Sequence, residues 1–192
     1  LMDSWFETVR ISVTFLFLAY SSWKDYQERE VSDTVWLLLA PIGLFFSLLQ
    51  AFLRTDISFL ISLAVSSMVM TGLSFALFYL DFFGGADAKA LICLSIALPT
   101  YPTVMNPSLD IVLPIFPLSV VSNAVFASCM LVFVIMFLNI SRYIKTGKRF
   151  FQGLEGESAV RRFFLFVTGV KVDLRKVKGN PHYIPLEIFS QG

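Results

Sequence analysis

The stretch TVWLLLAPIGLFFSLLQAFL, residues 34–53, decides the fold class of this chain. Its 20 residues include no charged side chain, and neither do the 24 residues of ISFLISLAVSSMVMTGLSFALFYL at 57–80. At about 1.5 Å per residue, a helix of either length crosses a hydrocarbon core of roughly 30 Å. We therefore predict two neighbouring membrane-spanning helices, antiparallel because only residues 54–56 connect them.

The composition of the whole chain also favours a membrane protein. Of its 192 residues, 56% are hydrophobic and 15% are charged, whereas soluble domains average about 45–50% apolar and about 25% charged residues. The two cysteines, Cys93 and Cys129, lie in apolar runs without CxxC spacing, and His182 is the single histidine. We therefore expect no disulfide framework, no metal and no cofactor.

Three further apolar segments complete the predicted topology. The first, residues 6–23, is long enough to span only if it includes Arg10, whose side chain can snorkel to the near interface. The fourth is expected to be a short helix that ends near Leu98, because prolines follow it. The fifth lies within 111–141 and should begin near Leu118, after two prolines. These segments predict an all-α polytopic membrane protein with five spans.

The distribution of basic residues orients this topology. All lysines and arginines except Arg10 and Arg54, 13 of the 15, fall on one side of the membrane. The positive-inside rule assigns that side to the cytoplasm. Asp3 and Glu7 precede the uncharged run at 11–23, where a secretory signal would have basic residues, so we predict a retained span with its N-terminus outside.

The sequence changes character after the fifth span. We predict a transmembrane helical domain at 1–141 and a basic cytoplasmic segment at 142–192, with 10 lysines and arginines against 4 acids. Juxtamembrane basic residues are typical of stop-transfer charge and attract anionic lipid, so membrane lipid is an expected partner. Residues 152–158 predict a loop, and the alternation within 163–177 predicts one or two short strands. We expect an α+β or β-containing C-terminal segment.

The run Gly84-Gly85-Ala86-Asp87 places a carboxylate on a small-residue turn at the mouth of an apolar segment. Neighbours of this size let a substrate backbone approach, and glycine allows turn conformations that are closed to larger residues. The alternative is a plain helix start, because aspartate is a good N-cap. Spacing alone does not decide between a functional and a capping role.

A second aspartate, Asp25, follows the first span on the same predicted side as Asp87. Two carboxylates that share a proton can provide the acid and the base of aspartic proteolysis. The alternative for Asp25 is a solvated loop; if the first helix continues, Asp25 and Arg29 share one face. Asp33 is expected to be the N-cap of the second span, and Asp81 is the second choice after Asp87.

These residues resemble the GxGD membrane aspartyl proteases, and within them the archaeal preflagellin (prearchaellin) peptidases, relatives of the type IV prepilin peptidases. Besides the two aspartates, Lys89 and the run Arg29-Glu30-Val31 contribute to the resemblance. It covers roughly 20–93 by motif and about 5–140 by topology. Ala86 stands where the motif has its second glycine, CxxC is absent, unlike in bacterial members, and the family has six spans where five are predicted.

The resemblance implies Asp25 and Asp87 as the catalytic pair. It further implies a turn supported by Gly84, Gly85, Ala86 and Lys89, and a substrate or structural contact for Arg29. The expected substrate is a preflagellin or prepilin-like precursor whose short basic leader precedes a hydrophobic helix. Cleavage would occur at the cytoplasmic face of the plasma membrane. We expect no nucleic-acid partner.

Three other functions stay open at this point. A presenilin-like protease would cut inside a substrate helix instead of beside it. A small transporter or channel subunit would bind a cation with its acids, but it needs charges near the bilayer midplane, and the predicted spans 34–53 and 57–80 contain none. A non-catalytic scaffold would act through its basic tail.

Overall fold

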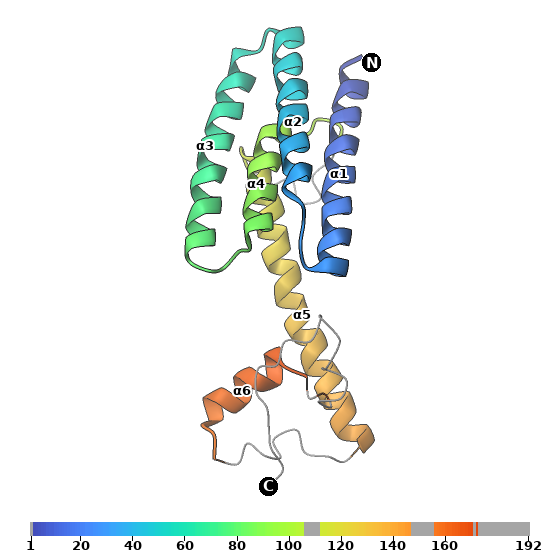
Figure 1. Ribbon diagram of the computed structural model, residues 1–192, viewed down its shortest axis with the longest axis vertical. Coiled ribbons are helices and arrows are strands. Elements are labelled where there is room, and N and C mark those ends of the chain that lie inside the picture. Colours follow the sequence, from blue (N-terminus) through green and yellow to red (C-terminus); the bar gives the residue numbers. More distant parts are fainter. Residues whose placement is uncertain (1, 106–111, 147–155, 171, 173–192) are drawn as a thin grey trace. The chain divides into compact units, whose positions relative to one another are not determined.

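The computed structural model describes residues 2–105, 112–146, 156–170 and 172. Over these ranges the chain forms helices and no strand (Figure 1). The helices are α1 (Met2–Glu28), α2 (Asp33–Arg54), α3 (Ile57–Tyr79), α4 (Gly85–Ala97), α5 (Phe116–Thr146) and α6 (Ala159–Thr168). The chain divides into two compact units, residues 1–122 and 123–192, and α5 crosses the boundary between them.

Three helices are long and apolar enough to cross a membrane. They are α2, α3 and residues Phe116–Lys145 of α5, with mean hydropathies of 2.0, 1.9 and 2.4. The helical character of the described residues is therefore confirmed, and the segments predicted at 34–53 and 57–80 are helices long and apolar enough to span. The helix α1 has 27 residues but includes charged ones, and α4 has only 13.

In the first unit, α2 and α3 are antiparallel neighbours, as predicted. Thr55 ends α2 in the left-handed conformation, with φ of 47°, and Asp56 begins α3 by accepting a hydrogen bond from the Phe59 backbone N–H at 3.1 Å. From this connection α2 and α3 diverge, and α4 lies between them and packs against both (Figure 1). The helix α1 packs against α2 and α4.

Small residues bring α2 and α4 into close contact. A Cβ atom added to Gly43 would lie only 2.7 Å from the Ala97 Cβ, so no larger residue fits there without movement. One turn later, the Ser47 hydroxyl donates a hydrogen bond of 2.7 Å to the Ile96 carbonyl, which the end of α4 leaves without a helical partner. Glycine and serine four residues apart allow such close packing in membrane helices. The helix α4 ends at Ala97, close to the predicted Leu98.

We expect Gly43→Ala to lower thermal stability and Gly72→Ala to raise it. At Gly43 the new methyl group would clash with Ala97, and overpacking typically costs about 1–3 kcal/mol. Gly72 lies in α3 with no atom within 4 Å of an added Cβ, so alanine there should gain the usual helical preference of about 0.5–1 kcal/mol. Thermal unfolding in detergent micelles measures both variants, and a shift in the same direction would contradict the close-packing argument.

A polar cluster in α1 corrects the prediction for Arg10. Its side chain is only 1% exposed, so it is enclosed by the protein instead of extending outward; it lies over the Phe59 ring, 5.6 Å from the centroid. Glu7, 3% exposed, approaches Arg10 at 3.9 Å and accepts hydrogen bonds from the backbone N–H and hydroxyl of Thr103. A long cation can be kept inside when a carboxylate and an aromatic ring lie beside it. The cluster fastens α1 to the segment that follows α4.

The helix α5 begins two residues before the predicted Leu118. Its first residue is Phe116, and Pro117 occupies the first turn. Proline is tolerated there because the first N–H groups of a helix have no helical acceptor. Pro117 therefore lies inside the first turn, whereas the sequence predicted a helix that begins after it.

In the second unit, the strand prediction for 163–177 is wrong wherever the structure describes it. Residues 159–168 form α6, which begins at Ser158, whose hydroxyl oxygen accepts a hydrogen bond from the Arg161 N–H at 3.2 Å. The many aromatic and β-branched residues suggested a strand, but four apolar residues recur at helical spacing: Val160, Phe163, Phe164 and Val167. The predicted alternation beyond residue 170 lies, apart from 172, outside the described residues, as does most of the predicted loop.

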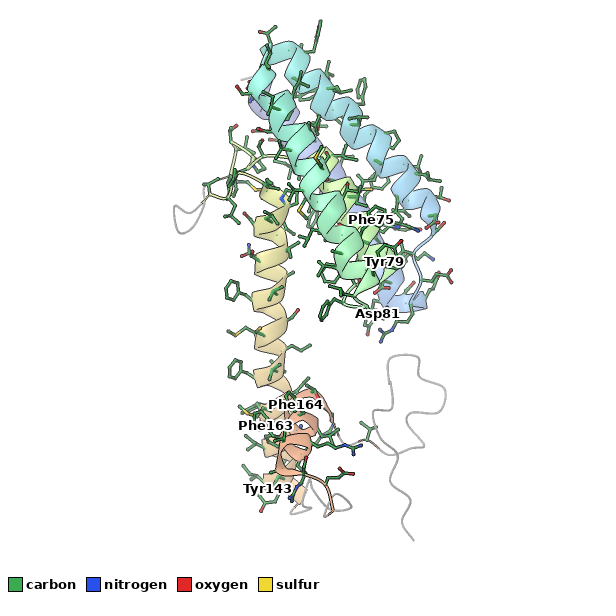
Figure 2. All side chains as sticks on the ribbon, turned by 90° about the vertical axis from the view of Figure 1, so that its left-hand side faces the viewer. Phe75, Tyr79, Asp81, Tyr143, Phe163 and Phe164 are labelled. Atoms are coloured by element: carbon green, nitrogen blue, oxygen red, sulfur yellow. The ribbon has the colours of Figure 1, made fainter. Side chains whose placement is uncertain are left out.

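The buried Asn139 holds α6 against α5. Its side-chain amide donates to the carbonyls of Phe166 at 2.7 Å and Gly169 at 2.8 Å. These hydrogen bonds satisfy carbonyls at the end of α6 that lack a helical partner. Phe163 and Phe164 remain exposed on the same helix (Figure 2).

Candidate active site

Asp87 lies in the first turn of α4. Gly84 is the N-cap, and its backbone N–H donates a hydrogen bond of 3.2 Å to the Asp87 Oδ2. A carboxylate three residues after the cap also interacts favourably with the positive end of the helix dipole. Asp87 is exposed, so the same group that helps to start the helix is also accessible from the surface.

The glycines of this turn do not adopt the conformations that the sequence analysis expected. Gly84 has φ of −69° and ψ of 161°, which any residue can adopt, and Gly85 is already helical. The residue with left-handed φ, 58°, is Asp81, which follows the stacked rings of Phe75 and Tyr79 at the end of α3 (Figure 2). The small size of Gly84 and Gly85 therefore leaves space beside Asp87, and the left-handed conformation of Asp81 reverses the chain direction between α3 and α4.

Ala86 faces the protein interior. It packs against a buried cluster of Val35, Trp36, Leu39 and Cys93, together with Ala90 one turn further along α4. Its methyl group thus contributes to the contact between α2 and α4. Alanine at the second glycine position of the motif is compatible with the helical start of α4.

Lys89 joins the first turns of α4 and α2. Its ammonium group forms an ion pair and hydrogen bond with the Asp33 carboxylate, and both side chains are exposed. Asp33 is not the N-cap predicted from the sequence. That position is Ser32, whose hydroxyl oxygen accepts the Thr34 N–H at 3.4 Å. Exposed ion pairs contribute little stability, about 0–1 kcal/mol, so this pair marks where the two helix starts meet and adds little to their packing.

Asp25 lies in the last turn of α1, which continues through the charged stretch to Glu28. The Asp25 carboxylate is exposed and makes no hydrogen bond or ion pair with any described residue. Lys24 beside it donates to Glu28, and this hydrogen bond raises the pKa of Lys24, which keeps its charge. Arg29 adopts a left-handed φ of 57° and closes the helix through its N–H to the Asp25 carbonyl, 2.9 Å away.

The two aspartates lie at the same end of the first unit. There α1 ends, α2 begins, α3 ends and α4 begins, and we call this the aspartate end (Figure 1). Phe17 and Leu18 of α1 pack on the same buried cluster as Ala86 of α4, so the two helices converge on one core.

The aspartate end has an excess of negative charge. Residues 24–33 and 81–89 contain six acidic and three basic side chains. Two of the acids, Glu28 and Asp33, are paired with Lys24 and Lys89. Within the described ranges, no group of three His, Cys, Asp or Glu side chains could hold a metal ion.

Comparison with known proteins identifies the family. The sequence model of the type IV leader peptidase family matches residues 12–140, a range that includes Asp25, Asp87 and all the turn residues between them. The chain belongs to the type IV leader peptidase family. This membership confirms the resemblance that the sequence motifs indicated.

Preflagellin peptidases are among the relatives within the type IV leader peptidase family. That of Methanococcus maripaludis strain C6 is 34% identical over 147 residues, which cover 73% of this chain and 64% of the relative. Those of Methanocaldococcus jannaschii and Methanococcus voltae are 32% identical over 133 residues and 28% over 145. These cover 67% and 73% of this chain, and 56% and 62% of the relatives. The chain thus spans less than two thirds of each relative's length.

Two features of the site were missed by sequence reasoning. The Lys89–Asp33 pair joins residues 56 apart, and a charged residue at each of two helix starts gives no local signal that they meet. Ser32 did offer a signal, because serine directly before an apolar periodic run is a common N-cap. Asp33, the next residue, is also a common N-cap and was predicted in its place.

Proposed function

We propose that this chain is a membrane aspartic endopeptidase that removes the short basic leader of preflagellin or type IV prepilin-like precursors. Asp25 and Asp87 would be its catalytic pair. The observation that carries this proposal is the presence of both exposed carboxylates at one end of the first unit, on helices that pack on a single core. Membership in the type IV leader peptidase family supports the same reaction.

The proposed chemistry needs one ionised and one protonated carboxyl group. The ionised group takes a proton from water as the water attacks the scissile carbonyl, and the protonated group donates a hydrogen bond to the carbonyl oxygen. The proton then passes to the leaving amine. Two carboxylates held close together cannot both ionise, which supplies the two forms from one residue type.

Catalysis therefore requires Asp25 and Asp87 to approach each other around the substrate. Asp87 is held by the Gly84 N–H, whereas the Asp25 carboxylate has no partner within the described part of the chain. The small Gly84 and Gly85 leave space next to Asp87 for an extended substrate backbone. The exposed Arg29 lies four residues beyond Asp25, where its side chain can contact substrate while its backbone closes α1.

We propose a five-span topology with the aspartate end in the cytoplasm of a multi-pass plasma membrane protein. The distribution of lysine and arginine supports this orientation. A 27-residue α1 is about 40 Å long, enough to cross the hydrocarbon core. The acidic excess of the aspartate end complements a basic leader, which would add electrostatic attraction at this surface.

The position of the carboxylates favours leader removal over the alternatives. Asp25 and Asp87 are exposed at helix ends, whereas cleavage inside a substrate helix would favour carboxylates deeper in the spans. A cation transporter would need acids within the apolar segments that are free to bind a cation. The helices α2 and α3 have none between Thr34 and Leu53 or between Ile57 and Tyr79, and the buried Glu7 of α1 already contacts Arg10 and Thr103. The substrate's leader would meet the protein at the membrane surface.

The test is cleavage of a preflagellin-type precursor by the purified protein in liposomes. Mass spectrometry of the products should show a single cut between the basic leader and the hydrophobic helix. A cut within the helix would instead support the presenilin-like alternative. Failure to cleave a panel of preflagellin and prepilin precursors would overturn the proposed function.

A further inference from the structure

A groove runs between α2 and α4 and opens at the aspartate end. Its volume is about 280 Å³, and the residues that line it follow helical spacing on both sides. We call it the α2/α4 groove; its lining comprises Asp33, Trp36, Leu37 and Ala40 of α2, and Lys89, Ile92 and Cys93 of α4.

The lining changes from apolar to charged along the groove. Trp36 and Cys93 are buried, whereas Leu37 is 72% exposed. The charged residues, Asp33 and Lys89, are one turn from the apolar ones and lie at the helix starts. The indole N–H of Trp36 has no hydrogen-bond acceptor among the described residues, which leaves a buried donor beside the groove.

The groove is adjacent to the proposed catalytic carboxylate. Lys89 is two residues after Asp87 on α4, and Cys93 is six residues after it. At about 1.5 Å per residue, the apolar part of the groove begins within roughly 9 Å of Asp87 along the helix axis. A bound polypeptide that leaves the groove at its charged end would therefore pass directly to the aspartate end.

We propose that the α2/α4 groove receives side chains from the first two turns of the substrate's hydrophobic helix. This inference rests on the proposed function and adds where the uncleaved part of the precursor binds. Apolar side chains at helical spacing can anchor one helix in a groove of another protein. A volume of about 280 Å³ suits one or two large apolar side chains.

The order of charge along the groove supports this occupant. In the precursor, a basic leader comes before the apolar helix. On the protein, the acidic aspartate end lies at the mouth of the groove, and the apolar lining lies further along α2 and α4. With the helix in the groove, the leader meets the acids and the junction between them lies beside Asp87. An acyl chain of a lipid would match the apolar lining alone.

The first test compares two substrates and two tryptophan variants. Leu37→Trp fills the groove, whereas Leu38→Trp is the matched control on the next residue, 51% exposed and outside the lining. The substrates are a full precursor and a short peptide with the leader and scissile bond but no hydrophobic helix. Leu37→Trp should lower the ratio of kcat/KM for precursor over peptide by about tenfold, mainly through a higher KM. Leu38→Trp should leave this ratio unchanged.

Two results of this comparison would overturn the groove assignment. One is an unchanged ratio in Leu37→Trp, which would indicate that a lipid chain or another segment occupies the groove. The other is an equal change of the ratio in both variants. The proposed function fails separately, when the wild-type protein cleaves neither substrate.

The second test is disulfide cross-linking, which does not depend on cleavage of the short peptide. Leu37→Cys and Leu38→Cys are compared in a background with Cys93→Ala, Cys129→Ser and Asp87→Asn, so that the precursor is not consumed. A precursor with one cysteine in the first two turns of its helix should cross-link to Leu37→Cys and not to Leu38→Cys. Equal cross-linking, or none in a protein whose wild type cleaves the precursor, would overturn the groove assignment alone.

Discussion

Asp25→Asn and Asp87→Asn are each expected to lower cleavage of a preflagellin-type precursor by about a thousandfold or more, because an amide cannot accept the proton of the attacking water. The fold should persist in both variants. At position 87 the amide oxygen can still accept the Gly84 N–H, so the start of α4 is kept. At position 25 the carboxylate has no partner to lose within the described residues. The measurement is initial cleavage rate in liposomes, with thermal unfolding as the check of folding.

The matched controls for this prediction are two other carboxylates of the aspartate end. Asp81→Asn preserves the left-handed turn, because asparagine tolerates that conformation well, and Glu30→Gln changes an exposed side chain. Both should cleave near the wild-type rate. The Asp25→Asn/Asp87→Asn double variant should be no slower than either single variant, since the two residues act as one unit. Loss of activity in Asp81→Asn with full activity in Asp87→Asn would move the catalytic assignment to the rival residue.

Ala86→Leu is expected to reduce cleavage by about a hundredfold and to destabilise the protein. Ala86 packs against the buried cluster of Val35, Trp36, Leu39 and Cys93, and we expect three additional carbon atoms to crowd these neighbours. Overpacking of this kind costs about 1–3 kcal/mol and shifts the backbone. The shift would occur in the turn of α4 that positions Asp87, and displacement of a reacting group by about 1 Å can cost a hundredfold in rate. Cleavage rate and thermal unfolding measure the two effects.

Two small substitutions in the same turn serve as controls for Ala86→Leu. Ala86→Gly restores the second glycine of the motif at a cost of about 1 kcal/mol in helix preference, and it should cleave near the wild-type rate. Gly85→Ala adds a Cβ that would lie 3.7 Å from the Phe78 ring, an ordinary contact, and should also be tolerated. Wild-type cleavage by Ala86→Leu would show that the packing of Ala86 does not position Asp87.

Hydropathy predicted the elements whose character depends on apolar length alone. The spans at 34–53 and 57–80 appear as α2 and α3, and the proline after Leu98 marks the end of α4. The residues that define helix ends were less predictable. Ser32 is the N-cap in place of Asp33, and Asp81 has the left-handed conformation in place of a glycine. Both depend on hydrogen bonds between residues two or three apart, which hydropathy does not describe.

Errors also arose where tertiary contacts overrode composition. Arg10 is buried because Glu7 and Phe59, 49 residues further along, lie beside it. The aromatic run at 159–168 forms a helix whose apolar residues recur at helical spacing, and the cap from Asn139 at its end is a contact 27 residues away that composition does not indicate. In the candidate site, the motif predicted Asp87 and Asp25, but their neighbours on other helices, such as the Lys89–Asp33 pair, depend on the fold.

The short helix α4 contacts side chains of α2 near both of its ends. Lys89 binds Asp33 near its start, and Ser47 binds the Ile96 carbonyl near its end. Sliding or rotation of α4 would break both contacts together. At the last turn of α1, the Arg29 N–H donates to the Asp25 carbonyl and Lys24 donates to Glu28, and both contacts stay within that helix end. If the two carboxylates come together on a substrate, we expect Asp87 to keep its position and Asp25 to move toward it.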